Sequence, residues 1–249
     1  MKLIDNLYGY PWMGTGNNCN SYFFANVLEG NSPHVIIDSG HITNETGEQC
    51  LSNLIKAIET DGFKASDIGL IINTHTHIDH YQANHALQEI TQKNSSANTA
   101  KKAQIALHEE AEHYRKTGGA RWLQIYGDAI NFEPDFFIKE GEFSLGKGGS
   151  KLDLQIIHAP GHGPGHICVY WPKNKALITG DIVFVASVGR TDLPGGDGDL
   201  LKQSIEKLSE FDSEYLFAGH STEYGWMLSG KDKVEHNFNF IKANYFPYL

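Results

Sequence analysis

One short stretch of the sequence concentrates side chains that bind metal ions. It reads His75-Thr76-His77-Ile78-Asp79-His80, and imidazole and carboxylate groups are common ligands of transition metals. Side chains two residues apart on an extended chain share a face, so His75 and His77 can point at one ion. We expect Asp79 and His80 to lie where the chain turns into a helix, within reach of a second ion. The spacing therefore predicts a site for two metal ions.

Three further candidate ligands each follow an apolar stretch and a glycine: His162 after residues 152–157, Asp181 after 176–179 and His220 after 215–218. Glycine lets the backbone turn sharply and approach a neighbour closely. Strand ends on one edge of an open sheet converge, and ligands bind there. We therefore expect seven ligands at one edge: His75, His77, Asp79, His80, His162, Asp181 and His220. This nitrogen and oxygen donor set suits zinc, and also iron, manganese or cobalt.

Expected strands and helices alternate in both halves of the chain and must position these ligands. Short apolar stretches predict strands, and apolar residues at helical spacing predict helices. The strands are expected over 20–27, 34–37, 68–73, 152–157, 167–171, 176–179 and 215–218, and the helices over 44–59 and 199–211. This alternation predicts a layered α/β architecture.

The middle of the chain reads as mainly helical and polar. A helix is expected over 101–115, followed by a break at Gly118-Gly119. We predict one domain over 1–249, with a helical insertion at about 85–145 between the two halves. Because a catalytic site needs walls that shape a pocket, the insertion is expected to cover the metal edge.

The amino-acid composition excludes some classes of binding partner and favours one cellular compartment. The formal net charge of −10 is unfavourable for binding a phosphate backbone, so no nucleic-acid partner is expected and a small-molecule substrate is favoured. Three widely spaced cysteines favour a reducing compartment. The sequence has no apolar signal region at its start and no stretch that could cross a membrane. These features predict a cytoplasmic protein without a membrane partner and leave the oligomeric state open.

The remaining polar residues carry weaker signals. His166 is expected to support a metal ligand rather than to be one. Arg190 could contact an anionic substrate, or pair with Asp192 or Asp197. The other histidines considered, at positions 85, 108, 113 and 158, are expected to be ordinary surface or core residues.

Four motifs, in this order, resemble those of the metallo-β-lactamase superfamily: THTHIDH at 74–80, APGHGPGH at 159–166, TGD at 179–181 and AGH at 218–220. The resemblance implies an αββα sandwich with two metal ions at one edge. It implies that His75, His77 and His162 hold the first ion, that Asp79, His80 and His220 hold the second, and that Asp181 bridges them.

The stretch VGRTDLPGGD at 188–197 is similar to the glyoxalase II-related branch, which includes hydroxyacylglutathione hydrolases and iron-dependent persulfide dioxygenases. The segment after His220 is shorter than the helical domain with which glyoxalase II binds glutathione. Whether the thiol part of the substrate is glutathione is therefore left open.

The leading hypothesis is a metal-dependent hydrolase of a small thioester, ester or lactone. A metal-bound hydroxide would attack the carbonyl carbon, and Asp79 would be both a ligand and the residue that orients this nucleophile. The first alternative is a mononuclear iron persulfide dioxygenase that uses His75, His162 and Asp181. The second is a nuclease of the same superfamily, which the acidic charge disfavours.

Overall fold

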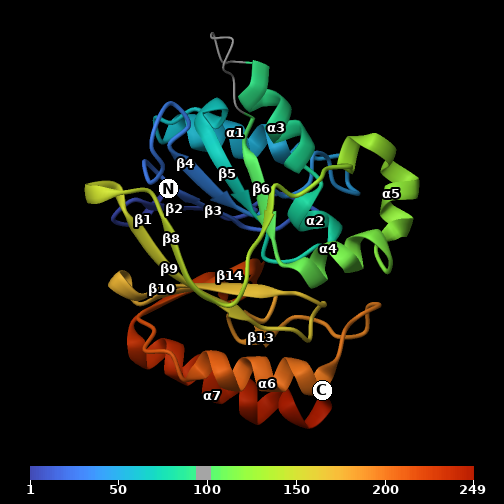
Figure 1. The fold of residues 1–249 in the computed structure, drawn as a ribbon. Coiled ribbons are helices and arrows are strands. Elements are labelled where there is room, and N and C mark those ends of the chain that lie inside the picture. Colours follow the sequence, from blue (N-terminus) through green and yellow to red (C-terminus); the bar gives the residue numbers. More distant parts are fainter. Residues whose placement is uncertain (94–101) are drawn as a thin grey trace.

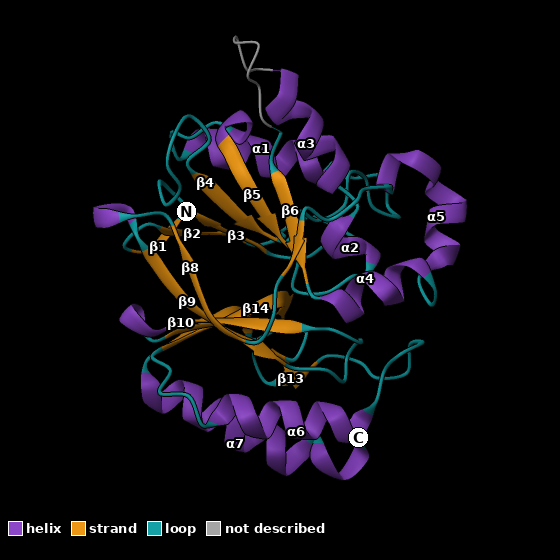
Figure 2. Ribbon diagram, in the orientation of Figure 1, coloured by secondary structure: helices purple, strands orange, loops and turns teal. Residues whose placement is uncertain are grey.

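Apolar strands buried on both faces form the centre of the molecule. The computed structural model, which describes residues 1–93 and 102–249, contains two large β-sheets that pack face to face, with helices over both outer faces (Figure 1). The layers run helix, sheet, sheet, helix (Figure 2). The expected αββα sandwich is therefore confirmed.

The first sheet follows the order of the sequence. Its strands are β1 (Lys2–Ile4), β2 (Leu7–Tyr10), β3 (Ser21–Phe24), β4 (His34–Ile37), β5 (Ile68–Ile72), β6 (Gln104–Leu107) and β7 (Phe136–Phe137). Strands β1 to β4 pair antiparallel, and β4 to β7 pair parallel. The parallel part brings the carboxyl ends of β4, β5 and β6 to the same edge.

The second sheet has the order β15 (Gly225–Ser229), β14 (Tyr215–Thr222), β11 (Ala176–Gly180), β10 (Ile167–Trp171), β9 (Leu152–His158) and β8 (Gly141–Leu145). Only β11 and β14 pair parallel among these neighbours. A small hairpin of β12 (Val183–Phe184) and β13 (Ser187–Val188) follows β11.

Helices α1 (Cys50–Thr60) and α3 (Asn84–Lys93) cover the first sheet, and α6 (Gly198–Ser209) and α7 (Lys231–Asn244) cover the second. Helices α2 (Ile78–Tyr81), α4 (Glu109–Lys116) and α5 (Ala120–Tyr126) lie together at one edge of the sandwich (Figure 1). Short 3₁₀ turns occur at Ala65–Asp67, Gly127–Ile130, Gly148–Ser150, Pro172–Asn174 and Phe246–Tyr248.

The period of two along each strand separates the layers of the core. In β4, Val35 and Ile37 belong to the core between the sheets, whereas Ile36 packs with α1 and α3. In β11, Ile178 belongs to the core between the sheets, whereas Leu177 packs with α6 and α7. Successive side chains of a strand point to opposite faces, so each strand contributes to two apolar layers.

The segment at about 85–145 differs from the predicted helical insertion. Its helices α3, α4 and α5 are accompanied by β6 and β7 of the first sheet and β8 of the second. The helix expected over 101–115 is wrong in its first part, because residues 104–107 form β6 and only 109–116 are helical; Lys101 lies outside the described residues. Residues 105–107 are fully buried beside β5, and this tertiary pairing outweighs the helical pattern. The break at Gly118-Gly119 is confirmed, since it separates α4 from α5.

Two smaller expectations concern the membrane and the cysteines. None of the helices in the described part of the chain is long and apolar enough to cross a membrane. Cys19, Cys50 and Cys168 are free thiols, and all three are buried.

Candidate metal centre

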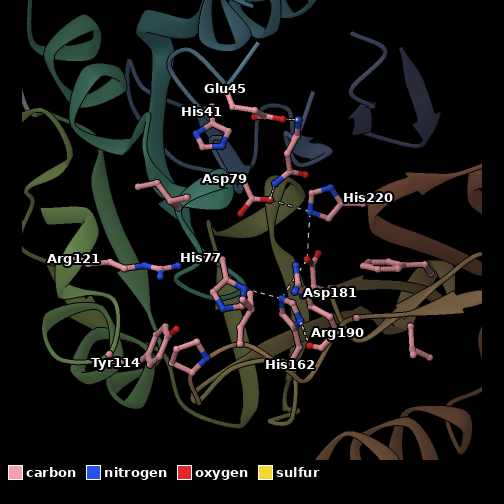
Figure 3. Close-up of a pocket in the computed structure, with 18 residues that line it drawn as sticks. His41, Glu45, His77, Asp79, Tyr114, Arg121, His162, Asp181, Arg190 and His220 are labelled. Atoms are coloured by element: carbon pink, nitrogen blue, oxygen red, sulfur yellow. Dashed lines mark hydrogen bonds and ion pairs between the residues drawn. The ribbon is translucent and has the colours of Figure 1, made fainter. Parts of the chain in front are cut away.

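The seven predicted ligands come from both sheets and converge at the edge next to α2. His75 lies three residues after β5, His77 is the residue before α2, and Asp79 and His80 belong to α2. From the second sheet, His162 follows β9, Asp181 follows β11 directly and His220 lies within β14. Figure 3 places His77, Asp79, His162, Asp181 and His220 around one space. The predicted convergence of the ligands at one edge is therefore observed, with both sheets contributing. The strand expected to end at Ala218 continues to Thr222, because residues 215–222 pair with β15, so His220 is presented from within a strand.

Three histidines form the first group. His75, His77 and His162 each offer a ring nitrogen, and these atoms lie within 4.8 Å of one another. Nδ1 of His77 is 2.7 Å from Nε2 of His162. Nδ1 of His162 is 2.7 Å from the carbonyl oxygen of Arg190 and can donate to it, which leaves the lone pair of Nε2 directed into the group.

Asp79, His80 and His220 form the second group, again with ligand atoms within 4.8 Å. Nε2 of His220 is 3.1 Å from Oδ2 of Asp79 and 3.2 Å from Nε2 of His80. Asp79 and His80 are neighbours in α2, whereas His220 comes from β14 in the other half of the chain.

Asp181 lies between the two groups. Its Oδ2 is 3.4 Å from Nε2 of His162 and 3.3 Å from Nε2 of His220, and its Oδ1 is 3.3 Å from Nε2 of His80. One carboxylate thus reaches members of both groups, as the predicted bridging position requires.

The ligand atoms of the site lack some hydrogen-bond partners, and their chemistry suits bound metal ions. Nε2 of His75 is buried and has no hydrogen-bond partner among the described residues, which is costly unless another group satisfies it. Five imidazoles and two carboxylates in contact form the nitrogen and oxygen donor set that zinc and iron prefer.

Several residues that sequence reasoning missed hold these ligands in place. Asp38, directly after β4, accepts a hydrogen bond from the backbone N–H of Thr74 at 2.8 Å, and its Oδ2 lies 2.9 Å from Nδ1 of His80. Asn17 donates from Nδ2 to Oδ2 of Asp79 at 2.8 Å. The sequence could have indicated Asp38, because this residue directly follows an expected apolar strand, as several ligands do. Asn17 lies in an irregular loop and carried none.

His166 has the supporting position expected for it. Its Nε2 accepts a hydrogen bond from the backbone N–H of Asp181 at 3.0 Å, and its ring stacks on that of His75 with centroids 4.8 Å apart. It therefore fixes the backbone that presents Asp181 while remaining outside both groups of candidate ligands.

The pKa is lowered in some histidines of the site and raised in others, depending on burial and on the nearby carboxylates. Burial lowers the pKa of His75 and His162, and it lowers the pKa of His77 to about 3. Burial also lowers the pKa of His220, but Asp181 and Asp79 more than offset this and raise it to about 10. The pKa of His80 is raised in the same way, mainly by Asp181 and Asp38. The first group is thus neutral, as metal binding requires, whereas the carboxylates hold a proton in the second group that a bound ion would replace.

A cavity of about 680 Å³ opens over both groups. One wall comes from the segment at about 85–145, through Tyr114 of α4, Gly118 and Arg121 of α5 (Figure 3). The expectation that this segment contributes to the metal edge is met by α4 and α5, whereas α3 packs on the outer face of the first sheet.

Arg190, the predicted substrate contact, also lines the cavity. Its guanidinium donates two hydrogen bonds of 2.6 Å to the carboxylate of Asp192, the partner named as its alternative role. Arg190 therefore contributes to the site through its carbonyl oxygen on His162, while its exposed guanidinium is paired with Asp192.

Comparison with known proteins identifies the family. The sequence model of the metallo-beta-lactamase superfamily matches residues 14–220, which include all seven candidate ligands. This chain belongs to the metallo-β-lactamase superfamily. A protein named "probable metallo-hydrolase" from Methanocaldococcus jannaschii is 31% identical over 212 residues, covering 83% of this chain and 89% of that protein.

Other members of the superfamily are similar over different shares of the chain. The hydroxyacylglutathione hydrolase GloC of Haemophilus influenzae is 36% identical over 110 residues, which are 43% of this chain and 49% of GloC. The crystal structure of TTHA1623 in a di-iron-bound form has a TM-score of 0.63 and 26% identity, and the alignment covers 96% of this chain and all of that one. The chain is thus similar to metallo-hydrolases in sequence and to a two-metal protein in structure.

Proposed function

We propose that this metallo-hydrolase cleaves a small thioester or ester, lactones included, at a centre of two metal ions. The observation that carries the proposal is the pair of adjoining three-ligand groups, joined by Asp181, beneath a cavity of about 680 Å³. That volume suits a small molecule. The partial similarity to a hydroxyacylglutathione hydrolase supports an acyl thioester as the substrate class.

The proposed ligands are His75, His77 and His162 for one ion and Asp79, His80 and His220 for the other, with Asp181 between them. Zinc is the proposed metal because histidine and carboxylate donors suit it, and iron or manganese suits the same donors. When bound, two such ions lower the pKa of water and polarise a carbonyl oxygen.

Asp79 is the proposed catalytic residue of the chain. Its Oδ2 faces His220 at 3.1 Å and is held by the amide of Asn17, so the carboxylate has a fixed direction at the cavity floor. A carboxylate fixed in this way can accept a hydrogen bond from an attacking water and orient it towards a carbonyl carbon. No serine or cysteine nucleophile is required.

The cavity wall supports an acyl substrate that carries an anionic group. Phe184, Leu193 and Pro194 offer apolar contact, while Arg121 contributes positive charge and the charge of Arg190 is paired with Asp192. Figure 3 shows Arg121 extending from α5 towards His77. With a net charge of −10 for the whole chain, Arg121 can favour a small anion at the site without favouring nucleic acid. The three buried free thiols are compatible with the proposed cytoplasmic location.

A mononuclear iron persulfide dioxygenase is the second candidate. Two observations favour it. Gly189 and Arg190 of the stretch GRTD at 189–192 line the cavity. Nε2 of His162 and Oδ2 of Asp181 are 3.4 Å apart, with the His162 ring beside that of His75. The complete group of Asp79, His80 and His220 does not separate the two candidates, because a mononuclear enzyme can retain these residues.

The test is metal analysis of protein purified without added metal, followed by assays on thioesters, lactones and glutathione persulfide. We expect about two zinc ions per chain and hydrolysis of a thioester or ester. One iron per chain, oxygen consumption with the persulfide in an oxygen electrode, and no hydrolysis would overturn the proposal in favour of the dioxygenase.

A further inference from the structure

A histidine that is not one of the seven candidate ligands lines the same cavity. His41 lies in the loop after β4, and only 6% of its surface is exposed. Its backbone N–H donates to Oδ1 of Asn18 at 2.7 Å, and its Nδ1 lies 2.9 Å from Oε1 of Gln82. These two contacts hold the residue in place, and the reaction proposed above gives it no role.

The partner of Nδ1 decides which nitrogen of the His41 ring carries the proton. Oε1 of Gln82 also accepts a hydrogen bond from the backbone N–H of Ile42 at 2.8 Å, so this atom is the amide oxygen and can only accept. Nδ1 of His41 must therefore donate to it, and in the neutral ring Nε2 carries a lone pair. Neutral His41 thus offers a hydrogen-bond acceptor at Nε2.

This acceptor is open to the cavity. Nε2 of His41 makes no hydrogen bond with any described residue, and it is not one of the fully buried polar atoms that lack a partner. Solvent therefore reaches it, and the space that His41 lines is the cavity over the metal centre. A buried ring with one accessible acceptor points to a hydrogen-bond donor that arrives with the substrate.

A carboxylate lies at the same end of the cavity. Glu45 also lines it, and Figure 3 places His41 and Glu45 on the same side of Asp79. Oε1 of Glu45 accepts a hydrogen bond from the backbone N–H of Asn17 at 2.6 Å, and the neighbouring residue Asn18 holds His41. The amide of Asn17 donates to Asp79, so this end of the cavity adjoins the metal centre.

No cation of the chain neutralises the charge of Glu45. Within residues 1–93 and 102–249, its carboxylate forms no ion pair with a lysine or an arginine, and Arg190 of the cavity is paired with Asp192. An acceptor-only imidazole beside an ionised carboxylate attracts a group that donates hydrogen bonds and carries positive charge. An ammonium group has both properties, whereas a carboxylate has neither.

We propose that His41 and Glu45 form a subsite for an ammonium group of the substrate. The inference rests on the proposed function for the bond that reacts, and it narrows the substrate class to thioesters or esters with an amine near the carbonyl carbon. An ammonium has three donors, so it can donate to both side chains and still to a water molecule. His41 and Glu45 would then determine specificity without binding metal.

The experiment is calorimetric binding of thioether analogues to the metal-loaded protein. A thioether cannot be hydrolysed, so binding is measured whatever the reaction of the metal centre. The compounds share N-acetylcysteamine as the thiol and carry an amine, a hydroxyl or a hydrogen atom at the same carbon of a propyl group. We expect the wild type to bind the amine about 10-fold more tightly than the other two, as hydrogen bonds between charged groups allow.

Two variants remove the subsite with little change of shape. In His41→Asn, the amide nitrogen takes the place of Nδ1 and can still donate to Gln82, but the acceptor at Nε2 is lost. Glu45→Gln removes the charge and keeps an oxygen for the backbone N–H of Asn17. Each variant should lose most of the preference for the amine while its affinity for the propyl compound stays unchanged.

Glu48→Gln is the matched control. This carboxylate belongs to the same loop and accepts a hydrogen bond from the backbone N–H of Thr15 at 2.8 Å, but it does not line the cavity over the metal centre. It should keep the preference of the wild type for the amine.

Two results would overturn the proposal. One is a wild type that binds the amine no better than the hydroxyl compound. The other is an unchanged preference in both His41→Asn and Glu45→Gln, which would place the amine on a metal ion instead. Failure of the proposed function would be distinct, because thioester hydrolysis would then be absent while the binding preference and its loss in the variants remained.

Discussion

Contacts between carboxylates and histidines set the charge state of the individual residues at the metal centre. Asp181 contacts His80, His162 and His220, and Asp38 contacts His80 from behind. Burial raises the pKa of Asp79 and Asp181, but the neighbouring histidines lower it by more, so both carboxylates stay ionised. Each side chain thus owes its charge state to partners from other elements.

Asp79→Asn tests the proposed catalytic role. The amide keeps the shape of the side chain and its place beside Asn17, but it removes a negative charge from the second group. If that charge acts mainly in the transition state, kcat should fall by about 100-fold or more with a much smaller change in KM. The measurement is steady-state kinetics on whichever thioester or ester the wild type hydrolyses.

Asp67→Asn is the control, since this carboxylate lies in the 3₁₀ turn before β5 and not in the cavity lining. Its kinetics should match the wild type. Unchanged kcat in Asp79→Asn, with both metal ions retained, would contradict the proposed role of Asp79.

At the level of elements, the loops that follow the strands position the ligands. The loop from Ala159 to His162 leaves β9, and the carbonyl oxygen of Gly161 accepts a hydrogen bond at 2.8 Å from the backbone N–H of Asp197, the N-cap of α6. Gly161 has a φ of +134°, which L-residues rarely adopt, and a Cβ there would overlap the backbone of Leu201. This glycine allows the loop to lie directly on α6.

Gly161→Ala should therefore destabilise the fold and displace His162. Backbone strain of this kind costs about 1–3 kcal/mol, and the overlap with Leu201 adds to it. We expect a lower melting temperature and weaker metal binding at the group that contains His162. Thermal unfolding with and without metal measures both effects.

Gly163→Ala is the matched control two residues along the same loop. Its φ is not in the left-handed region, and the nearest atoms to an added Cβ belong to the ring of His77 at 3.8 Å, an ordinary contact distance. Its melting temperature should stay close to that of the wild type. Equal losses in both alanine variants would argue against the strain at Gly161 as the cause.

For the whole molecule, the metal centre joins the two halves of the sandwich. Four of the candidate ligands come from the first half of the chain, and three come from the second. In the absence of metal, the contacts between these halves at the site include the pairs of His220 with Asp79 and of His80 with Asp181. Stability should therefore depend on both metal and pH.

A chelator should lower the melting temperature, and the metal-free protein should lose further stability in alkaline solution. The pKa of His220 is raised from 6.5 to about 10 in the folded chain, because Asp181 and Asp79 outweigh the effect of burial. Its proton therefore stabilises the fold fully below about pH 6.5, and this contribution is lost as the pH rises through about 10. The metal-loaded protein, in which the ion takes the place of that proton, should lose less.

Melting temperatures of the metal-free and metal-loaded protein across this pH range provide the measurement. Metal-free His220→Gln is the control, because it lacks the titrating group and should show a weaker dependence on pH than the metal-free wild type. Parallel pH curves for all three samples would contradict this origin of the alkaline loss.

The sequence by itself determined the local parts of this architecture. Short runs of apolar and β-branched residues at 34–37, 68–73 and 167–171 favour strands, and β4, β5 and β10 occupy these ranges to within one residue. The spacing of His75, His77, Asp79 and His80 predicted two nearby groups, because a strand end and the first turn of a helix have fixed geometry. Gly180, the residue before Asp181, likewise marked the end of β11, whereas Gly219 and His220 lie within β14.

Tertiary structure decided what depends on contacts between distant segments. Residues 104–107 are a strand because β5 offers a parallel partner, although their local pattern also fits a helix. Asp38 and Asn17 acquire their roles only by lying against His80 and Asp79. His108 and His158 looked unremarkable 50 positions apart in the sequence, yet their rings stack once the sheets pack. Local spacing fixes which side chains share a face, but only the packing of the two sheets fixes which faces meet.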